Sequence, residues 1–482
     1  MTSPASYDAI VIGAGMSGLA AAIRLAMFDK RVVVLERHGI PGGLNSYYHR
    51  SRRPFDVGLH ALTNYAAQGA RGAPLTKLLR QLRIPWEALR LREQLGSEVR
   101  FPGVTLAFTN DFQVLRHSVR EAFPAHADAF DRLSAAVNAY DNLSLDVPER
   151  PVGPFLEEHI SDPLLREMLL CPLMYYGSAV EDGMELGQFC TMWKSIFQEG
   201  FARPEGGVRT VVKLLVDRLK EAGGELRFKR GVQRILTRGG RAVGVRLENG
   251  EELTAPAVIS TAGWFETLAM TDEAPPPAPG AGPGRMTFLE SILCLKVQPR
   301  ELGIDQTIVF FNDSERFHYR PPEDYLDLRS GVVCLSNNYR DQEPLPEGLL
   351  RITSIASWER WSALEKPEPY QQTKLEWHRR QVDAIRGLFP SFSDHVVCVD
   401  VFTPTTIHHY PRHLNGAVYG APVKARTGLT PVQGLFVAGT DQGFLGVVGA
   451  MLSGISIANA RVLMAGAVSP RSAPDGAALE GA

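Results

Sequence analysis

The feature that most constrains this chain is a glycine-rich segment near its N-terminus, set between two short apolar runs. Residues 8–37 read DAIVIGAGMSGLAAAIRLAMFDKRVVVLER. The runs AIVI and VVVL have the length of buried strands, and the Ala- and Leu-rich stretch between them favours a helix. Gly13, Gly15 and Gly18 fall in the G-x-G-x-x-G spacing. Together these features predict a strand–turn–helix–strand unit that binds a dinucleotide.

Each glycine of this unit has a physical role. Gly13 permits the tight turn out of the first strand, Gly15 lets a pyrophosphate approach the backbone, and Gly18 allows close packing of helix on strand. The expected helix covers Leu19 to Phe28, and Met16 and Ser17, just before it, are expected to bind the dinucleotide. The free N–H groups of this helix and the positive end of its dipole favour a phosphate at this point.

An acidic residue, Glu36, ends the second strand and is followed by Arg37. A carboxylate at this place accepts hydrogen bonds from the ribose of an adenosine, and it would repel a 2′-phosphate. An NADP-type ligand is therefore disfavoured. The alternative is a glycine-rich turn without a ligand, which does not explain why the acid falls where a ribose would lie.

Composition indicates an ordinary globular protein. The 482 residues predict two or three interleaved domains. The net charge of −2 gives no reason to expect a nucleic-acid partner. Five cysteines are scattered without a C-x-x-C pair or a His–Cys cluster, so we expect a reducing compartment, no disulfide framework and no metal site.

The N-terminus, MTSPASYD, lacks the basic and apolar regions of a signal peptide. No run of about 18 apolar residues stands out, so we expect no membrane-spanning helix. These observations predict a cytoplasmic protein and leave peripheral membrane contact open.

Two further stretches carry a family resemblance. Residues 41–48 read PGGLNSYY and residues 55–62 read FDVGLHAL. With the first motif, they resemble the amine-oxidase-like FAD flavoproteins, and look closest to the branch of phytoene desaturases, carotenoid isomerases and retinol saturases. The resemblance implies FAD as cofactor, with its pyrophosphate and ribityl chain near Gly43, Leu44 and Asn45 and its ring near FDVG. Many amine oxidases carry Arg where Leu44 stands, so amine oxidation is less favoured.

The C-terminal block carries the second strong signal, GLFVAGTDQGFLGVVGAMLSG at residues 434–454. A predicted strand ends at Gly439. The resemblance implies that Asp441 accepts from ribityl hydroxyls or lies near the pyrophosphate, and that N–H groups around Val447 and Val448 hold the N1/O2 edge of the flavin. It also implies that the strand carrying Val232 places its backbone against the adenine.

The expected fold is α/β: a Rossmann-like FAD-binding domain interleaved with a mixed-sheet substrate domain and a helical insertion. Helical apolar spacing indicates the insertion, and alternating apolar residues indicate antiparallel strands in the substrate domain. The expected parts are a discontinuous FAD-binding domain (1–69, 201–272 and 425–467), a helical cap (70–200), a substrate-binding domain (285–424), a Pro/Gly-rich loop (273–284) and a disordered tail (468–482).

Catalytic candidates are few. His60 is the polar side chain expected nearest the flavin, the alternative being a histidine satisfied by nearby backbone. His409 is a second candidate; it follows His408 on an expected strand, where adjacent residues face opposite sides. Tyr176 and Trp193 would line a substrate tunnel, although most of their apolar neighbours are expected to be core.

The sequence thus predicts an FAD-dependent oxidoreductase that acts on a long apolar polyene, carotenoid or related isoprenoid. Desaturation or cis–trans isomerisation is favoured over saturation. Two alternatives stay open: a flavin amine or amino-acid oxidase, or an oxidase of a secondary-metabolite intermediate; and a non-enzymatic chaperone of prenylated partners with the same fold. The intact glycine motif argues against the chaperone. The sequence predicts no oligomeric state.

Overall fold

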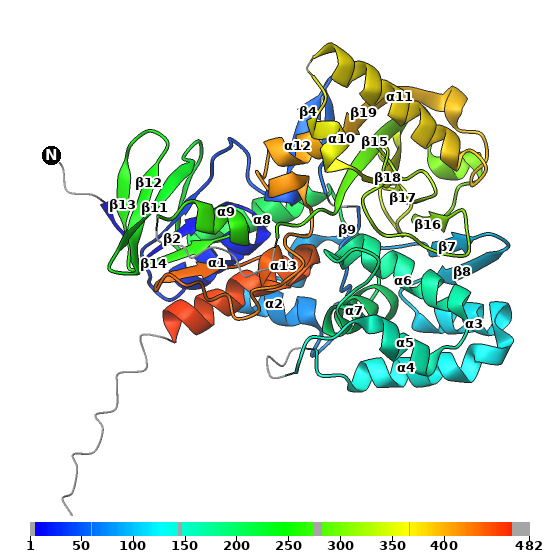
Figure 1. Cartoon of the computed structure of the whole chain (residues 1–482), viewed down its shortest axis with the longest axis horizontal. Helices are drawn as coiled ribbons and strands as arrows, with labels where there is room; N and C mark the ends of the chain where they lie inside the picture. The colour runs from blue at the N-terminus through cyan, green and yellow to red at the C-terminus, as the bar shows by residue number, and fades with distance from the viewer. Residues whose placement is uncertain (1–4, 59, 143–146, 273–281, 366, 465–482) are drawn as a thin grey trace, which may run out of the picture.

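The computed structural model describes residues 5–58, 60–142, 147–272, 282–365 and 367–464. Figure 1 shows the nucleotide-binding domain on the left, a second sheet at the upper right and a lobe of helices below that sheet. The fold is α/β, with a parallel sheet in the nucleotide-binding domain and a large mixed sheet in the second domain, as the sequence predicts. The expected tail and most of the Pro/Gly-rich loop lie outside the described residues.

The nucleotide-binding domain is built on a five-stranded parallel sheet. Its strands, in spatial order, are β10 (Glu225–Arg227), β3 (Val32–Leu35), β2 (Ala9–Ile12), β14 (Ala257–Ser260) and β20 (Leu435–Val437). β2, β3 and β14 are buried along their whole length, as expected of apolar strands covered on both faces.

A four-stranded sheet adjoins this domain. Its order is β1 (Ala5–Ser6), β13 (Glu252–Thr254), β12 (Arg241–Leu247) and β11 (Val232–Arg238). β12 and β13 are antiparallel across the Asn249-Gly250 turn. This is the hairpin that the Asn-Gly pair predicts.

Helices complete the nucleotide-binding domain: α1 (Met16–Ala26), α2 (Pro74–Leu82), α8 (Val208–Glu221), α9 (Trp264–Ala269) and α13 (Gly446–Ile457), which continues into the π-helix η9 (Ala458–Leu463). Contrary to the sequence expectation, Gly446–Leu463 is long and apolar enough to span a membrane by length and composition alone. Its apolar character also has a packing use. A Cβ on Gly454 would lie 2.0 Å from the carbonyl oxygen of Ser17, so α13 contacts α1 closely.

The second sheet has seven strands. Their order is β19 (Val396–Phe402), β15 (Thr287–Leu295), β18 (Gly348–Ala356), β17 (Ser330–Leu335), β16 (Ile308–Asn312), β7 (Ser97–Phe101) and β8 (Val104–Phe108). All neighbours are antiparallel except β16 and β7. Three helices accompany it: α10 (Trp358–Ser362), α11 (Glu368–Ile385) and α12 (Pro404–His409).

The helical lobe holds α3 (Phe112–Ala122), α4 (Ala127–Ala139), α5 (Val152–His159), α6 (Pro163–Gly177), α7 (Leu186–Trp193) and the π-helix η4 (Lys194–Gln198). The stretch 70–200 was expected to be a helical cap, and it also contributes β7 and β8 to the seven-stranded mixed sheet. Two small ladders pair β4 (Tyr47–Arg50) with β5 (Arg53–Asp56), and β6 (Leu91–Glu93) with β9 (Ala202–Pro204).

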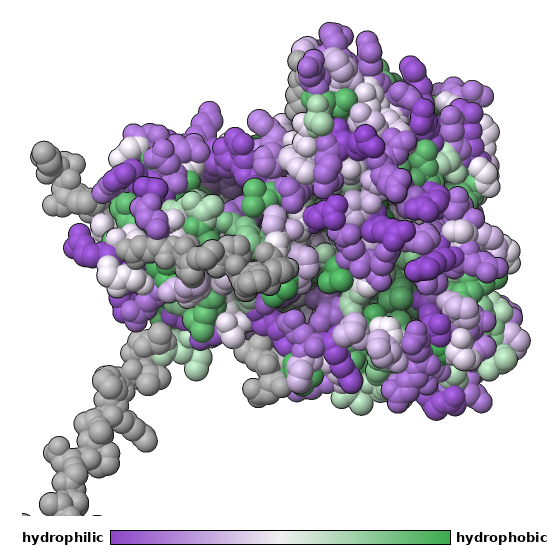
Figure 2. All heavy atoms as spheres, in the orientation of Figure 1, coloured by the Kyte–Doolittle hydropathy of each residue, from purple (hydrophilic) through white to green (hydrophobic). Residues whose placement is uncertain are grey.

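Short 3-10 helices connect these elements: η1 (Gly43–Asn45), η2 (Trp86–Leu89), η3 (Pro124–His126), η5 (Pro299–Leu302), η6 (Ser393–His395), η7 (Leu414–Gly416) and η8 (Thr440–Gln442). The face of the molecule in Figure 2 is dominated by hydrophilic side chains, with smaller hydrophobic patches between them. The apolar residues of the chain are thus gathered mainly in the cores of the three parts.

Candidate cofactor and substrate site

A cavity of about 1180 Å³ is lined by residues from the nucleotide-binding domain, the mixed sheet and the helical lobe. A pocket for one drug-sized ligand measures roughly 300–1,000 Å³. The cavity is therefore larger than a single ligand of that size requires.

Glycines shape the nucleotide end of this cavity. Gly13 has a φ of +97°, a region that L side chains rarely adopt. A Cβ on Gly18 would lie 2.0 Å from the carbonyl oxygen of Gly13, so glycine is needed for α1 to begin this close to the turn. Gly15 differs, because its φ is −73° and an added Cβ would meet no atom within 4 Å. Gly15 lines the cavity together with Met16 and Ser17, so the space above it is an open cradle.

Glu36 lies on the cavity lining just after β3. Its Oε2 accepts from the N–H of Ala14 at 2.9 Å, and its Oε1 accepts from the N–H of His38 at 2.9 Å. These bonds fix the carboxylate, while each oxygen keeps acceptor capacity for a ribose hydroxyl. Arg37 also lines the cavity, and its Nη2 lies 3.8 Å from Glu248 Oε1.

The second glycine turn lies directly against the first. The N–H of Gly42 donates to the carbonyl of Ala14 at 2.8 Å. A Cβ on Gly58 would lie 2.4 Å from the carbonyl oxygen of Leu44, so the FDVG segment packs on the same turn. The predicted residues of this turn all line the cavity: Gly43, Leu44 and Asn45. The structure thus brings the first two sequence motifs together.

The C-terminal candidates divide into two groups. Gly439 and Val447 line the cavity, as does Val232 at the start of β11. Val448 does not line it and is instead buried in the core of the nucleotide-binding domain. The helix α13 therefore turns one of its two predicted valines toward the ligand and the other toward the protein.

Asp441 corrects an expectation. Its Oδ2 accepts from the N–H of Trp264 at 2.5 Å, and its Oδ1 accepts from the N–H of Ala421 at 2.7 Å. The side chain is buried and does not line the cavity, so it joins two loops instead of facing the ribityl chain. Thr440, one residue earlier, does line the cavity. The sequence analysis missed it, although its place directly after the β20–glycine turn is where a ligand contact is expected.

These residues fit FAD. The cradle above Gly15 suits a pyrophosphate, Glu36 suits a ribose, and the turns after β2 and β20 lie on one side of the same cavity. FAD supplies hydride or electron transfer when bound. Among the described residues, no group of three or more His, Cys, Asp or Glu could hold a metal ion.

The mixed sheet walls the other end of the cavity. Strand register places one row of side chains across four strands: Phe402 on β19, Glu290 on β15, Thr353 on β18 and Val332 on β17. All four line the cavity. Glu290 is the charged member of this row, between an aromatic ring and a threonine. Further aromatic and aliphatic side chains line the cavity beside this wall: Tyr175, Tyr176, Phe288, Val418, Tyr419 and Leu445.

His60 lines the cavity and contacts the carboxylate of Glu290. Its Nε2 lies 2.8 Å from Glu290 Oε2. The other oxygen of Glu290 accepts from Arg351 Nε at 2.5 Å. Burial alone would raise the pKa of the Glu290 carboxyl, but Arg351 and His60 outweigh it and hold that pKa below its ordinary value. Glu290 is therefore ionised at neutral pH, and His60 has a carboxylate partner, which excludes the expected backbone-only alternative.

The sequence analysis missed Glu290 and Arg351. They are the only charged residues of two otherwise apolar or neutral strand segments, FLESILCL and LLRITSIA. A lone charge in a buried strand is a signal in itself, because a buried ion requires a partner.

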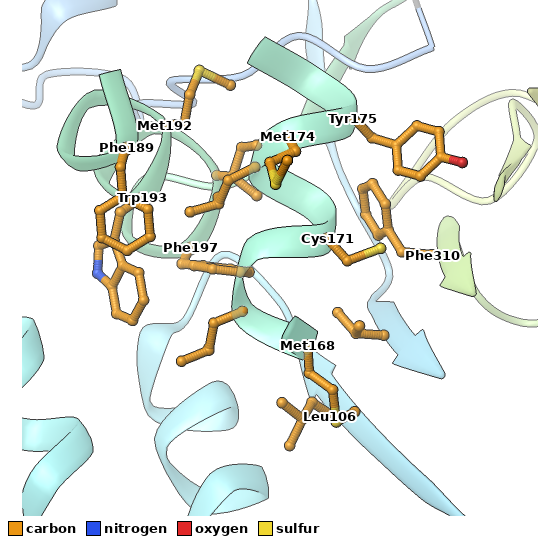
Figure 3. Close-up of a cluster of buried hydrophobic side chains, with 14 of the residues drawn as sticks. Leu106, Met168, Cys171, Met174, Tyr175, Phe189, Met192, Trp193, Phe197 and Phe310 are labelled. Atoms are coloured by element: carbon orange, nitrogen blue, oxygen red, sulfur yellow. The ribbon is translucent and has the colours of Figure 1, made fainter. Parts of the chain in front are cut away.

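Trp193 and His409 do not line the cavity. Trp193 is fully buried in the core of the helical lobe, beside Phe189 and Phe197 (Figure 3). His409 is exposed at the end of α12, beside the ring of Tyr410, and not on a strand as expected. Tyr176 does line the cavity, as the sequence predicts.

Comparisons with known proteins identify the family of this chain. The model of the family described as flavin containing amine oxidoreductase matches residues 16–461. Prolycopene isomerase 2 of an Oncidium hybrid cultivar is 26% identical over 501 residues, covering 94% of this chain and 83% of that protein. The all-trans-retinol 13,14-reductase of Danio rerio is 23% identical over 540 residues, covering 94% and 85%.

Solved structures show the same fold. The crystal structure of an oxidoreductase from Methanosarcina mazei superposes with a TM-score of 0.66 at 18% identity, covering 94% of this chain and 99% of that one.

Proposed function

The chain belongs to the flavin-containing amine oxidoreductase family, and from this premise we propose that it is an FAD-dependent oxidoreductase acting on an apolar polyene or isoprenoid. The proposed reactions are carotenoid-type desaturation, isomerisation or saturation. Prolycopene and all-trans-retinol, the compounds in the names of two relatives, are both apolar polyenes.

One observation carries the proposal: a single cavity joins a dinucleotide cradle to a largely apolar and aromatic chamber. The chamber side chains, such as Tyr176, Phe288 and Val332, offer dispersion contacts along a long substrate. The remaining polar group of the wall row, Thr353 Oγ1, is buried and has no hydrogen-bond partner among the described residues.

An amine substrate is the second candidate, and the charges of the chamber disfavour it. A protonated amine buried in the chamber would be stabilised best by an unpaired carboxylate. Glu290 is already bound to Arg351 and His60. Asp400, also on the cavity lining, accepts from the Tyr48 hydroxyl at 2.7 Å and is paired with an arginine, Arg50.

The test is anaerobic mixing of the FAD-loaded chain with prolycopene, all-trans-retinol or putrescine. Each polyene is added once to oxidised and once to reduced flavin, and products are separated by chromatography. Consumption of either polyene supports the proposal. Bleaching of the flavin by putrescine, followed by hydrogen peroxide when air is admitted, would contradict it and support an amine oxidase. A protein that takes up no FAD would support the chaperone alternative.

A further inference from the structure

His60 is held at both its backbone and its ring. Its N–H donates to the carbonyl of Gly58 at 3.2 Å, and its own carbonyl accepts from the Tyr339 hydroxyl at 3.0 Å. The ring is held through Nε2 by Glu290. The orientation of the imidazole in the cavity is thus fixed from several sides.

Glu290 is fixed in turn. Arg351 binds it through Nε, and Arg351 Nη2 donates to the carbonyls of Asp56 at 3.0 Å and Val57 at 2.6 Å. These carbonyls belong to the FDVG segment, four and three residues before His60. The chain Arg351–Glu290–His60 therefore ties the mixed sheet to the segment that the nucleotide-binding domain presents to the cavity.

This arrangement decides which nitrogen of His60 carries the proton. An ionised carboxylate only accepts, so Nε2 must donate to Glu290. Nδ1 is then the nitrogen able to gain or lose a proton. It makes no hydrogen bond to any described residue. A histidine oriented by a carboxylate, with its other nitrogen free, is the arrangement of a general acid or base.

We propose that Nδ1 of His60 exchanges a proton with the substrate and that Glu290, locked by Arg351, is the positioning residue that sets this tautomer. This inference rests on the proposed function and assigns it a reaction class, the paired transfer of a hydride and a proton.

The balance of that reaction is simple. In desaturation, oxidised FAD held by the cradle at Gly15 and by Glu36 would supply the acceptor for a hydride, with its two electrons, from one carbon. The adjacent carbon gives a proton to His60 Nδ1, and the electrons of that C–H bond form the new C=C bond. Saturation is the reverse, with the hydride from reduced FAD and the proton from Nδ1. Arg351 keeps the proton on the imidazole, because it stabilises Glu290 as an anion.

The other ionisable groups near the cluster leave this arrangement intact. Asp56 on β5 is bound by Arg203 of β9 at 2.6 Å, and Arg209 of α8 lies 3.6 Å from its other oxygen. Burial raises the pKa of the nearby tyrosine hydroxyls, so they stay protonated: Tyr48, Tyr176 and Tyr339. Glu290 is thus the anion in direct contact with the His60 ring.

The test is a nitrogen-15 NMR titration of the FAD-loaded chain with labelled histidine, in which His60→Gln assigns the His60 signals. We expect the neutral ring to be protonated at Nε2 and to gain its second proton at Nδ1. In Glu290→Gln the neutral ring should no longer favour the proton on Nε2, because a side-chain amide can donate as well as accept.

Glu347→Gln is the matched control. Glu347 accepts from Arg53 Nε and Nη2 at 2.7 Å each and does not line the cavity. The same amide substitution there should leave the proton of the neutral His60 ring on Nε2. Loss of this preference in both variants would overturn the proposal.

The wild-type spectrum keeps the test decisive even if Glu290→Gln does not fold. A neutral His60 protonated at Nδ1 would overturn this inference alone, because the measurement needs no substrate. The expected tautomer together with no turnover of prolycopene or all-trans-retinol would instead overturn the proposed substrate class.

Discussion

The two ends of the cavity are built in different ways. The nucleotide end is lined by backbone groups at glycines, which have no side chain to fill the space. These glycines stand in short contiguous motifs around Gly15 and Gly43. The substrate wall is made from side chains far apart in the sequence, such as His60 and Glu290, which are separated by 230 positions. The positions of glycines in the sequence specify the nucleotide end. The register of the strands specifies the substrate wall, because it decides which side chains come together.

The largest effect is expected from Gly15→Val. An added Cβ meets no protein atom within 4 Å there, so the fold should persist while the cradle is filled. We expect FAD affinity to fall at least ~100-fold, about 2.7 kcal/mol, with little change in thermal unfolding of the apoprotein. Absorbance of bound flavin and a melting curve measure both.

Gly153→Val is the matched control for this change. Gly153 also has open space for a side chain, but it does not line the cavity. Full FAD binding is expected in this control. Equal flavin content in the two variants would contradict a backbone-built nucleotide end.

In the mixed sheet, Arg351→Met should lower the free energy of unfolding. It leaves the buried Glu290 without its cation, which costs about 3–5 kcal/mol of unfolding free energy. Urea denaturation measures this loss. The double variant with Glu290→Gln should recover part of it, because the uncompensated charge is removed. If Arg351→Met lowers the unfolding free energy by less than about 1 kcal/mol, the stability of the mixed sheet does not depend on the Arg351–Glu290 ion pair.

Lys424 tests a partly buried charge that lies between Tyr419 and Asp441. Desolvation lowers its pKa to about 8 despite the opposing charge of Asp441, whose Oδ1 lies 4.0 Å from Nζ, and Nζ donates to the carbonyl of Tyr419 at 2.6 Å. A lowered pKa of a base means that the folded state disfavours its proton. This destabilisation is fully present below about pH 8 and disappears as the pH rises toward the ordinary value of 10.5.

We therefore expect Lys424→Met to be more stable than the wild type near pH 7, by up to about 3 kcal/mol. The advantage should shrink between pH 8 and pH 10.5. Chemical denaturation across this range measures it, and a difference that stays constant with pH would be inconsistent with a buried, shifted lysine.

The smallest effect is expected from Thr353→Val. The hydroxyl has no partner among the described residues, so its loss should change the unfolding free energy by less than about 1 kcal/mol. An apolar polyene offers nothing to bond it, so the KM for such a substrate should stay the same. A several-fold rise in KM would instead indicate a polar group on the substrate at this place.

The comparison also explains what the sequence could predict. The G-x-G-x-x-G turn, the acid after β3 and the PGGL turn are local patterns, and the structure places their cavity-lining residues together. Asp441 was expected to face the cofactor, but the residue before it, Thr440, lines the cavity instead. Asp441 accepts from the N–H of Trp264. Motif spacing alone does not fix that orientation.

Other errors have physical causes. His409 was assigned to a strand, yet Thr403 and Thr406 form a capping box and Pro404 occupies the first helical turn. These are helix-start signals that the alternating reading overlooked. Trp193 was ambiguous because a packed core and an apolar tunnel use the same residue types. The strands β7 and β8 form a local hairpin across Pro102-Gly103, a turn signal that the helical interpretation of this stretch did not use. Only the pairing of β7 with β16, about 210 residues later, is long-range.

The most direct measurement of the central claim is the visible absorption spectrum of the purified chain, recorded before and after adding FAD and removing the excess. The structure predicts flavin bands that correspond to one FAD per chain. A colourless protein that takes up no FAD would contradict the assignment of the cavity to a flavin and a substrate.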